Sequence, residues 1–246
     1  MYVSVDNTHV WVEDEGDGPP LLFLHGGLGD HRLFDPQRLA LADAFRCVAY
    51  DRSLWGRSAT PEGTISFVDE AIGVLDALAV EQAALVGLSM GGGLALDVAA
   101  AHPDRVRAVV HVAGGASGMP VDPYTPEQNE VFESGTLAEK MAADFAVWAP
   151  LGSDPFFEEL WLATPDAREV PDDLELRPSP PLVPEQVAQP TLVVVVRDDP
   201  PAQQEVGREL ARRLPNARLV EVDSDHYVTL REPELVTRLI REFLAA

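Results

Sequence analysis

The stretch Val86-Gly87-Leu88-Ser89-Met90-Gly91-Gly92 joins an apolar run to a segment rich in glycine and alanine. Residues 83–87 have the composition of a buried strand, and residues 90–101 have that of a helix. In a Gly-x-Ser-x-Gly pattern between strand and helix, the serine lies on a sharp turn and its hydroxyl projects above the sheet. Side chains at positions 87 and 91 would collide, so both must be glycine. This stretch therefore predicts Ser89 as a nucleophile.

Outward from this turn, short apolar runs alternate with segments of helical spacing. Runs that suit buried strands lie at residues 21–24, 47–50, 83–87, 106–112, 191–196 and 218–222, after a hairpin near 2–5 and 9–13. Helical segments are expected at residues 33–45, 66–78, 90–101, 202–214 and 233–244. Because strands alternate with helices, we expect an α/β fold with a mostly parallel, doubly wound sheet of eight strands.

The alternation stops between residues 118 and 190. Twelve of the 21 prolines fall there, among helical fragments near 125–148 and 155–162. A structureless loop of that length is uncommon in a compact domain. We therefore expect residues 118–190 to form a small helical cap, inserted into a core domain made of residues 1–117 and 191–246.

Ser89 needs further groups to react. A serine hydroxyl is a weak nucleophile at neutral pH, so it requires a general base, and the base requires an orienting acid. For this kind of turn the acid and then the histidine follow the serine along the chain. His226 comes directly after the last expected strand and is the only histidine in the C-terminal half. It is therefore the predicted base.

The acid is expected after the strand at residues 191–196, where Asp198 and Asp199 are adjacent. The two side chains would point in different directions. Asp199 is preferred, and Asp198 remains the alternative. Asp223 and Asp225 lie too close to the histidine in sequence to reach the far nitrogen of its ring, so both are expected to be solvated.

Attack by a serine on a carbonyl carbon places negative charge on the carbonyl oxygen, and two hydrogen-bond donors are expected to stabilise this oxyanion. The backbone N–H of Met90, at a helix N-terminus, is the first expected donor. The second is expected from His25-Gly26-Gly27-Leu28-Gly29, which follows the first parallel strand. Gly27 is preferred there and Leu28 comes next. One such donor is worth roughly 3 kcal/mol. The glycine spacing matches neither G-x-G-x-x-G nor a Walker loop, which disfavours nucleotide binding.

At these residues the sequence resembles the α/β-hydrolase superfamily, in the capped group of small esterases, enol-lactonases, carbon–carbon bond hydrolases and cofactor-free haloperoxidases. The resemblance rests on His25-Gly26-Gly27, Asp51 to Ser58, the turn at Ser89, His102 to Val106, Asp199 and His226. It implies a Ser-His-Asp triad, an acyl-enzyme, and neither a metal nor an organic cofactor. Dehalogenases and epoxide hydrolases of this fold use an aspartate nucleophile, so Ser89 argues against both.

The sequence departs from these relatives at three places. After the strand at residues 47–50, Ser53 replaces an arginine and Leu54 replaces a glycine. Val196 and Asp225 each stand where relatives have glycine, before the acid and before the histidine. The altered loop at Leu54 and Trp55 either lines the site or repacks.

The expected pocket is apolar. Its walls are assigned to Leu28, Trp55, Phe145, Trp148 and Trp161. We expect a small to medium apolar ester or lactone as substrate. One alternative is a carbon–carbon bond hydrolase, or a biosynthetic lyase or cyclase, on the same triad. Another is a non-catalytic protein that binds a ligand on a hydrolase scaffold.

Composition limits the partners. The formal net charge is −23, from 41 acidic and 18 basic residues, so binding to nucleic acid or to a membrane is not expected. Cys47 is the only cysteine, which permits neither an internal disulfide nor a cysteine-rich metal site. The N-terminus lacks the features of a signal peptide, so a cytoplasmic location is expected. The expected partner is a small-molecule substrate, and a homodimer is left open.

Overall fold

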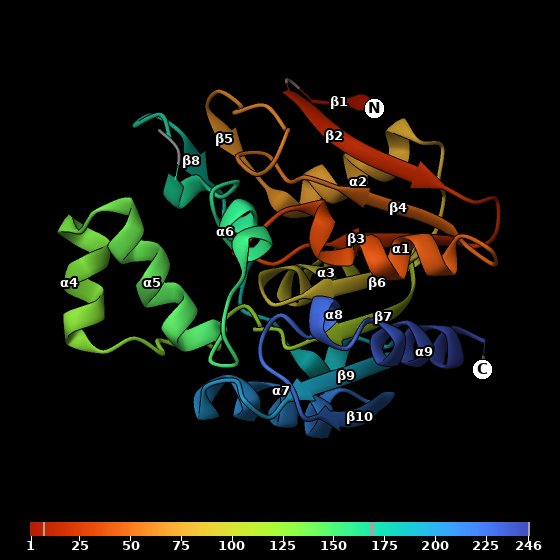
Figure 1. The fold of residues 1–246 in the computed structure, drawn as a ribbon. Coiled ribbons are helices and arrows are strands. Elements are labelled where there is room, and N and C mark those ends of the chain that lie inside the picture. Colours follow the sequence, from red (N-terminus) through yellow and green to blue (C-terminus); the bar gives the residue numbers. More distant parts are fainter. Residues whose placement is uncertain (7, 168–169, 246) are drawn as a thin grey trace.

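An eight-stranded sheet forms the centre of the molecule in the computed structural model, which describes residues 1–6, 8–167 and 170–245. Its order is β1-β2-β4-β3-β6-β7-β9-β10 (Figure 1). The strands are β1 (Tyr2–Val5), β2 (Thr8–Glu15), β3 (Pro20–Leu24), β4 (Arg46–Tyr50), β6 (Ala83–Leu88), β7 (Val106–Val112), β9 (Thr191–Val196) and β10 (Ala217–Val222). β2 is antiparallel to both its neighbours, and the other pairs are parallel. The predicted mostly parallel sheet is confirmed.

Helices cover both faces of this sheet. On one face lie α1 (Asp35–Leu41) and α9 (Pro233–Leu244), and on the other lie α2 (Phe67–Ala77), α3 (Met90–Ala101) and α7 (Pro201–Arg213). The short helix α8 (Val228–Arg231) precedes α9. In β3, Leu21 and Phe23 pack into the first apolar layer, and Leu22 and Leu24 into the second. Burial on both faces explains why the parallel strands are continuously apolar.

A helical insert lies between β7 and β9. It contains α4 (Pro126–Ser134), α5 (Leu137–Trp148) and α6 (Pro155–Trp161). Thr125 and Thr136 begin α4 and α5 with capping boxes, which satisfy the first free N–H groups of each helix. In Figure 1, α4 and α5 form a pair that stands away from the sheet, and α6 lies between that pair and the core. No helix in the described ranges is both long and apolar enough to cross a bilayer.

A small second sheet ties the insert to the core domain. Its strands, β5 (Thr64–Ile65) and β8 (Glu175–Leu176), run parallel. The N–H of Arg177 donates to the carbonyl of Ile65 at 2.8 Å, and the Arg177 guanidinium pairs with Asp69 at the start of α2. Strands of two residues have no sequence periodicity, so the sequence did not predict this sheet.

Candidate active site

Ser89 lies on the turn between β6 and α3. Its backbone has φ 56° and ψ −120°, which is a rare conformation for a residue other than glycine. The N–H of Ser89 donates to the carbonyl of Val112 at 2.9 Å, and the carbonyl of Ser89 accepts from the N–H of Gly92 at 2.9 Å. These bonds from β7 and α3 hold the strained turn in place.

Close backbone packing explains the two glycines of the turn. A Cβ atom at Gly87 would lie 2.1 Å from the carbonyl oxygen of Gly91. A Cβ atom at Gly91 would lie 1.9 Å from the carbonyl oxygen of Leu24, at the end of β3. A side chain at position 87 would therefore collide with the other end of the turn, as expected. A side chain at position 91 would instead collide with the backbone at the end of β3.

The close approach to β3 makes position 91 sensitive to substitution. We expect Gly91→Ala to lower the free energy of unfolding by about 3 kcal/mol, because backbone atoms of two elements must separate. Urea denaturation measures this change. Gly115→Ala is the matched control, since a Cβ atom there meets nothing within 4 Å. Equal stability of the two variants would contradict the explanation.

His226 and Asp199 form a buried pair. Nδ1 of His226 lies 3.0 Å from each carboxylate oxygen of Asp199, and both residues are 4% exposed. The side chain of Gln204 donates to the Asp199 carbonyl at 2.7 Å, which fixes the loop after β9. Asp198 is exposed, and its N–H donates to the carbonyl of Ser224. The fold thus brings Asp199 to the imidazole and turns Asp198 to solvent.

The other two aspartates near His226 differ from each other. Asp223 is 80% exposed and pairs with Arg197 at 2.7 Å, as a solvated residue would. Asp225 is fully buried, so the expectation that it is solvated was wrong. Arg231 approaches it to 2.8 Å and compensates its charge, which is the physical reason that the carboxylate tolerates burial.

The loop after β3 lies against Ser89. A Cβ atom at Gly26 would lie 3.3 Å from Cβ of Ser89, and one at Gly27 would lie 3.5 Å from Cε of Met90. Met90 is the first residue of α3, so its N–H has no partner within the helix. The Trp55 indole donates to the carbonyl of Gly27 at 2.8 Å and fixes the Gly27–Leu28 peptide, which carries the N–H of Leu28. Gly27 and Met90, which are expected to supply the two donors, both line the cavity that also contains Ser89.

Leu54 keeps the backbone conformation that a glycine would favour. Its φ is 81°, in the left-handed region where a leucine is strained. Its neighbour Trp55 stacks on the buried guanidinium of Arg52 at 4.4 Å. Ser53, which stands where relatives have arginine, donates its N–H to both carboxylate oxygens of Glu70 at 3.2 Å. The side chains of the altered loop thus pack against one another. Trp55 also lines the cavity that contains Ser89.

Two buried charges lie under this loop. Burial raises the pKa of Glu70 to about 7 and lowers the pKa of Arg52 to about 10. The Arg52 guanidinium donates to the carbonyl of Gly26 at 3.1 Å, so it supports the glycine loop from below. It packs against Trp55 and Phe67 and also forms part of the wall of a second cavity beside Ser89.

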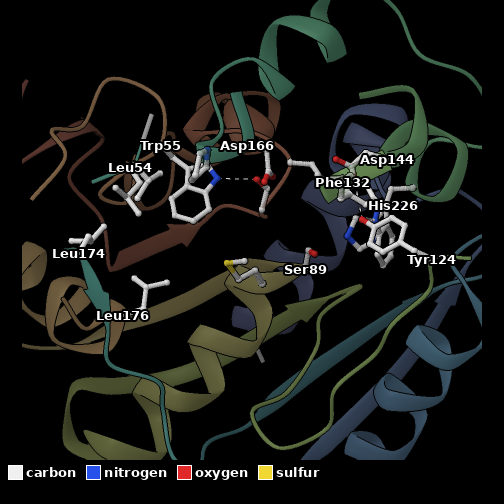
Figure 2. Close-up of a pocket in the computed structure, with 16 residues that line it drawn as sticks. Leu54, Trp55, Ser89, Tyr124, Phe132, Asp144, Asp166, Leu174, Leu176 and His226 are labelled. Atoms are coloured by element: carbon white, nitrogen blue, oxygen red, sulfur yellow. Dashed lines mark hydrogen bonds between the residues drawn. The ribbon is translucent and has the colours of Figure 1, made fainter. Parts of the chain in front are cut away.

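A cavity of about 610 Å³ opens above Ser89. Figure 2 shows Ser89 between one group that contains Trp55 and Leu176 and another that contains His226 and Tyr124. The walls are formed by Gly27, Leu28, Leu54, Trp55, Ser89, Met90, Tyr124, Phe132, Asp144, Trp148, Pro165, Asp166, Val170, Leu174, Leu176 and His226.

Three of the five predicted pocket residues, Leu28, Trp55 and Trp148, line this cavity. Phe145 and Trp161 do not, and that part of the prediction was wrong. Both are buried in the apolar core, where Phe145 packs near Tyr227 with ring centres 6.3 Å apart. On an amphipathic helix the sequence does not distinguish the face toward the core from the face toward a cavity.

A polar network that the sequence analysis missed orders the insert side of the cavity. The carboxylate of Asp144 accepts from the Tyr124 hydroxyl at 2.6 Å and from the Trp161 indole at 2.7 Å. The Trp148 indole donates to the Tyr124 oxygen at 2.8 Å. Burial raises the pKa of Asp144, and its two donors oppose that rise. A carboxylate within the apolar pattern of residues 137–148 was the available signal.

A second cavity of about 670 Å³ meets the first at Ser89, Met90, Trp148 and Leu176. It extends toward α3 and is lined on that side by Phe67 and Leu94 and by residues 115–121. Among the described lining residues, His226 belongs to the first cavity and not to the second. Two adjoining cavities therefore lie beside Ser89, and among their described walls the imidazole of His226 belongs to the first.

One group of side chains has the spacing of metal ligands. Atoms of Asp30, His31 and Asp51 lie within 4.8 Å of one another. Asp51 accepts from both the N–H and the Nδ1 of His31, at 2.9 and 2.6 Å, and from the N–H of Arg57. Asp30 is held by Arg32. These carboxylates already have protein donors, so the group stabilises the loop that follows β4.

Comparison with known proteins adds family relationships to this geometry. A family model described as "Alpha/beta hydrolase family" matches residues 21–239. A 2-hydroxymuconate semialdehyde hydrolase of Pseudomonas putida is 29% identical, and the match covers 95% of this chain and 90% of that protein.

Two solved structures share the fold over the whole chain. An enol-lactonase from Burkholderia xenovorans LB400 superposes with a TM-score of 0.80 at 24% identity and full coverage of both chains. A thermophilic esterase from Thermogutta terrifontis superposes with a TM-score of 0.79 at 23% identity, covering 100% of this chain and 97% of that one.

Proposed function

This chain belongs to the α/β-hydrolase family, and on that premise we propose that it is a serine hydrolase of small to medium apolar esters or lactones. One observation carries the proposal. Ser89 stands on a strained turn beside a cavity that also contains His226, and Nδ1 of His226 lies 3.0 Å from both oxygens of Asp199. Such an arrangement supplies a nucleophile, a base and an orienting acid.

The proposed reaction proceeds in two halves. His226 Nε2 takes the proton of the Ser89 hydroxyl while Oγ attacks the substrate carbonyl. The N–H groups of Met90 and Gly27 stabilise the oxyanion that forms. His226 then gives its proton to the leaving oxygen, and the acyl-enzyme remains. A water molecule, deprotonated by His226, attacks the acyl group, and His226 returns the proton to Oγ of Ser89 as the bond to the acyl carbon breaks and the acid leaves. Asp199 keeps the imidazole oriented throughout.

The two cavities suggest how the substrate lies. The leaving oxygen receives its proton from His226, so the leaving group lies on that side of Ser89. The first cavity, which contains His226 and the insert aromatics, then takes the alcohol part of an ester. The second cavity, which includes Phe67, Leu94 and Met119, takes the acyl part. Because Asp144 lies in the first cavity, a neutral leaving group fits better than an anionic one.

A carbon–carbon bond hydrolase is the second candidate. The observation in its favour is the likeness to the 2-hydroxymuconate semialdehyde hydrolase over 95% of this chain. The substrate in that name is an anion, and the described walls of the first cavity hold Asp144 and Asp166 but neither lysine nor arginine. The second cavity contains Arg52 and Arg177 together with Asp97. Because the carboxylates of the first cavity lie on the side of His226, where the leaving group is placed, we prefer the ester or lactone hydrolase.

A substrate panel tests the proposal. The purified protein should hydrolyse p-nitrophenyl acetate and butyrate, with an initial burst if deacylation is slow. Neutral alkyl esters and lactones should be cleaved, whereas esters with a carboxylate in the alcohol part should be poor substrates. The acid 2-hydroxymuconate semialdehyde, which the name of the relative gives as its substrate, serves as the competing substrate. Turnover of that acid without ester or lactone hydrolysis would favour the second candidate, and inactivity toward the whole panel would count against both.

A further inference from the structure

Asp225 connects three parts of the protein although it is completely buried. One oxygen of its carboxylate accepts from Nε of Arg231 at 2.8 Å and from the N–H of Tyr227 at 3.2 Å. The other oxygen accepts from the N–H of Leu151 at 3.3 Å. Leu151 belongs to the segment between α5 and α6, so one side chain next to His226 reaches into the helical insert.

Arg231 completes this connection from the end of α8. Its guanidinium donates to the carbonyl of Gly152 in the same segment of the insert. It also lies over the Phe157 ring of α6, with 5.0 Å between the guanidinium carbon and the ring centre. Asp225 and Arg231 therefore bind an N–H and a carbonyl of neighbouring insert residues while they neutralise each other. We call this ion pair and its two backbone bonds the 225–231 clamp.

The backbone that carries the imidazole is held by the same insert. The N–H of His226 donates to the carbonyl of Trp148 at 3.2 Å, and the two rings lie 4.4 Å apart. The next residue, Tyr227, stacks on Phe157 at 4.2 Å with 19° between the rings. Its hydroxyl donates to the carbonyl of Leu28 at 3.4 Å. The segment at 226–227 thus lies between the insert and the loop that is expected to bind the oxyanion.

We propose that Asp225 and Arg231 are positioning residues for His226. The 225–231 clamp fixes residues 148–152 of the insert to the loop after β10, so the imidazole keeps its working position only while the insert is docked. This inference rests on the proposed function, because it takes His226 as the general base. It also accounts for an aspartate at a position where relatives have glycine.

Substitution at position 225 tests this role. Asp225→Gly removes the carboxylate that accepts from Arg231 and Leu151, and it should lower kcat by about 100-fold, because small displacements of a catalytic group are costly. KM should change by less than about threefold, since neither residue is among the described walls of the two cavities beside Ser89. Asp225→Asn keeps an oxygen for the N–H groups and should lose only about tenfold in kcat. Arg231→Leu should resemble Asp225→Gly.

Coupling between the two residues gives a sharper criterion. If both act through one clamp, the double variant Asp225→Gly/Arg231→Leu should lose no more activity than the more impaired single variant. Losses that multiply would overturn the shared role. The control is Asp223→Gly, two residues earlier in the same loop, whose carboxylate is exposed and pairs with Arg197. It should keep wild-type kcat.

A measurement without substrate separates this inference from the proposed function. Amide hydrogen exchange at residues 149–154 should be faster in Asp225→Gly, while exchange in β3 and β6 stays as in the wild type. Unchanged exchange at 149–154, or faster exchange with unchanged kcat, would refute the positioning role. If the wild type hydrolyses no ester or lactone, the proposed function fails, and the exchange data still decide whether the clamp holds the insert.

Discussion

Ser89→Ala should abolish labelling by a fluorophosphonate probe and lower kcat by about 10⁵-fold. The reason is geometric as well as chemical. Alanine keeps the turn at φ 56°, the oxyanion donors and both cavities, and it removes only the oxygen that forms the acyl-enzyme. The variant should therefore remain folded and bind substrate with little change in affinity. Mass mapping of the labelled wild-type protein should place the probe on the peptide that contains Ser89.

The control for this experiment is a serine whose hydroxyl is exposed on the surface, away from the turn at Ser89. Ser134 is exposed at the end of α4 and is distant from Ser89 in the sequence. The Ser134→Ala protein should therefore react with the fluorophosphonate probe at the wild-type rate. Labelling of the Ser89→Ala protein, or a probe found on another residue of the wild type, would refute the central assignment. A small residual rate is expected, because the oxyanion donors stabilise the transition state without the nucleophile.

Asp199→Asn should lower kcat by about 10³–10⁴-fold with a much smaller effect on KM. The amide has the shape of the carboxylate, so the buried packing around it is preserved. It nevertheless offers an N–H where His226 needs an acceptor for Nδ1–H, and it supplies no charge to stabilise the imidazolium that forms during the reaction. A steady-state comparison with p-nitrophenyl butyrate measures the loss.

The neighbouring aspartate is a matched control. Asp198 is adjacent and exposed, so Asp198→Asn should retain kcat within about twofold, as is usual for a solvated surface charge. The opposite ranking of the two variants would show that the acid had been assigned to the wrong residue. Similar, small losses in both would indicate that the imidazole is oriented by another group.

The sheet and the order of the reactive groups could be predicted because they depend on local patterns. Continuous apolar runs such as 191–196 identify strands that are buried on both faces, and the glycines at 87 and 91 identify a turn of fixed shape. Once the sheet is parallel, the carboxyl ends of its strands lie along one edge. The loops that carry Ser89 and His226 therefore lie at the same edge of the sheet, although β7 and β9 separate the strands that they follow.

The rest depends on contacts between distant segments. Nothing local distinguishes Phe145, which packs in the core, from Trp148, which lines the cavity, although both lie on α5. Asp144 and Tyr124 come from separate helices or loops, and their hydrogen bond exists only when the insert has folded. Burial of Asp225 likewise depends on Arg231 and Leu151, whose proximity the sequence does not reveal.

The pairing of β5 with β8 has a consequence for the order in which the chain assembles. Thr64 and its partner Glu175 are 111 positions apart, and the nucleophile turn, β7 and all of α4, α5 and α6 lie between them. Closing so long a loop is slow unless the intervening chain is already compact. The central sheet should therefore form first. Hydrolytic activity should return during refolding only in a later phase, when the helical insert has docked beside Ser89.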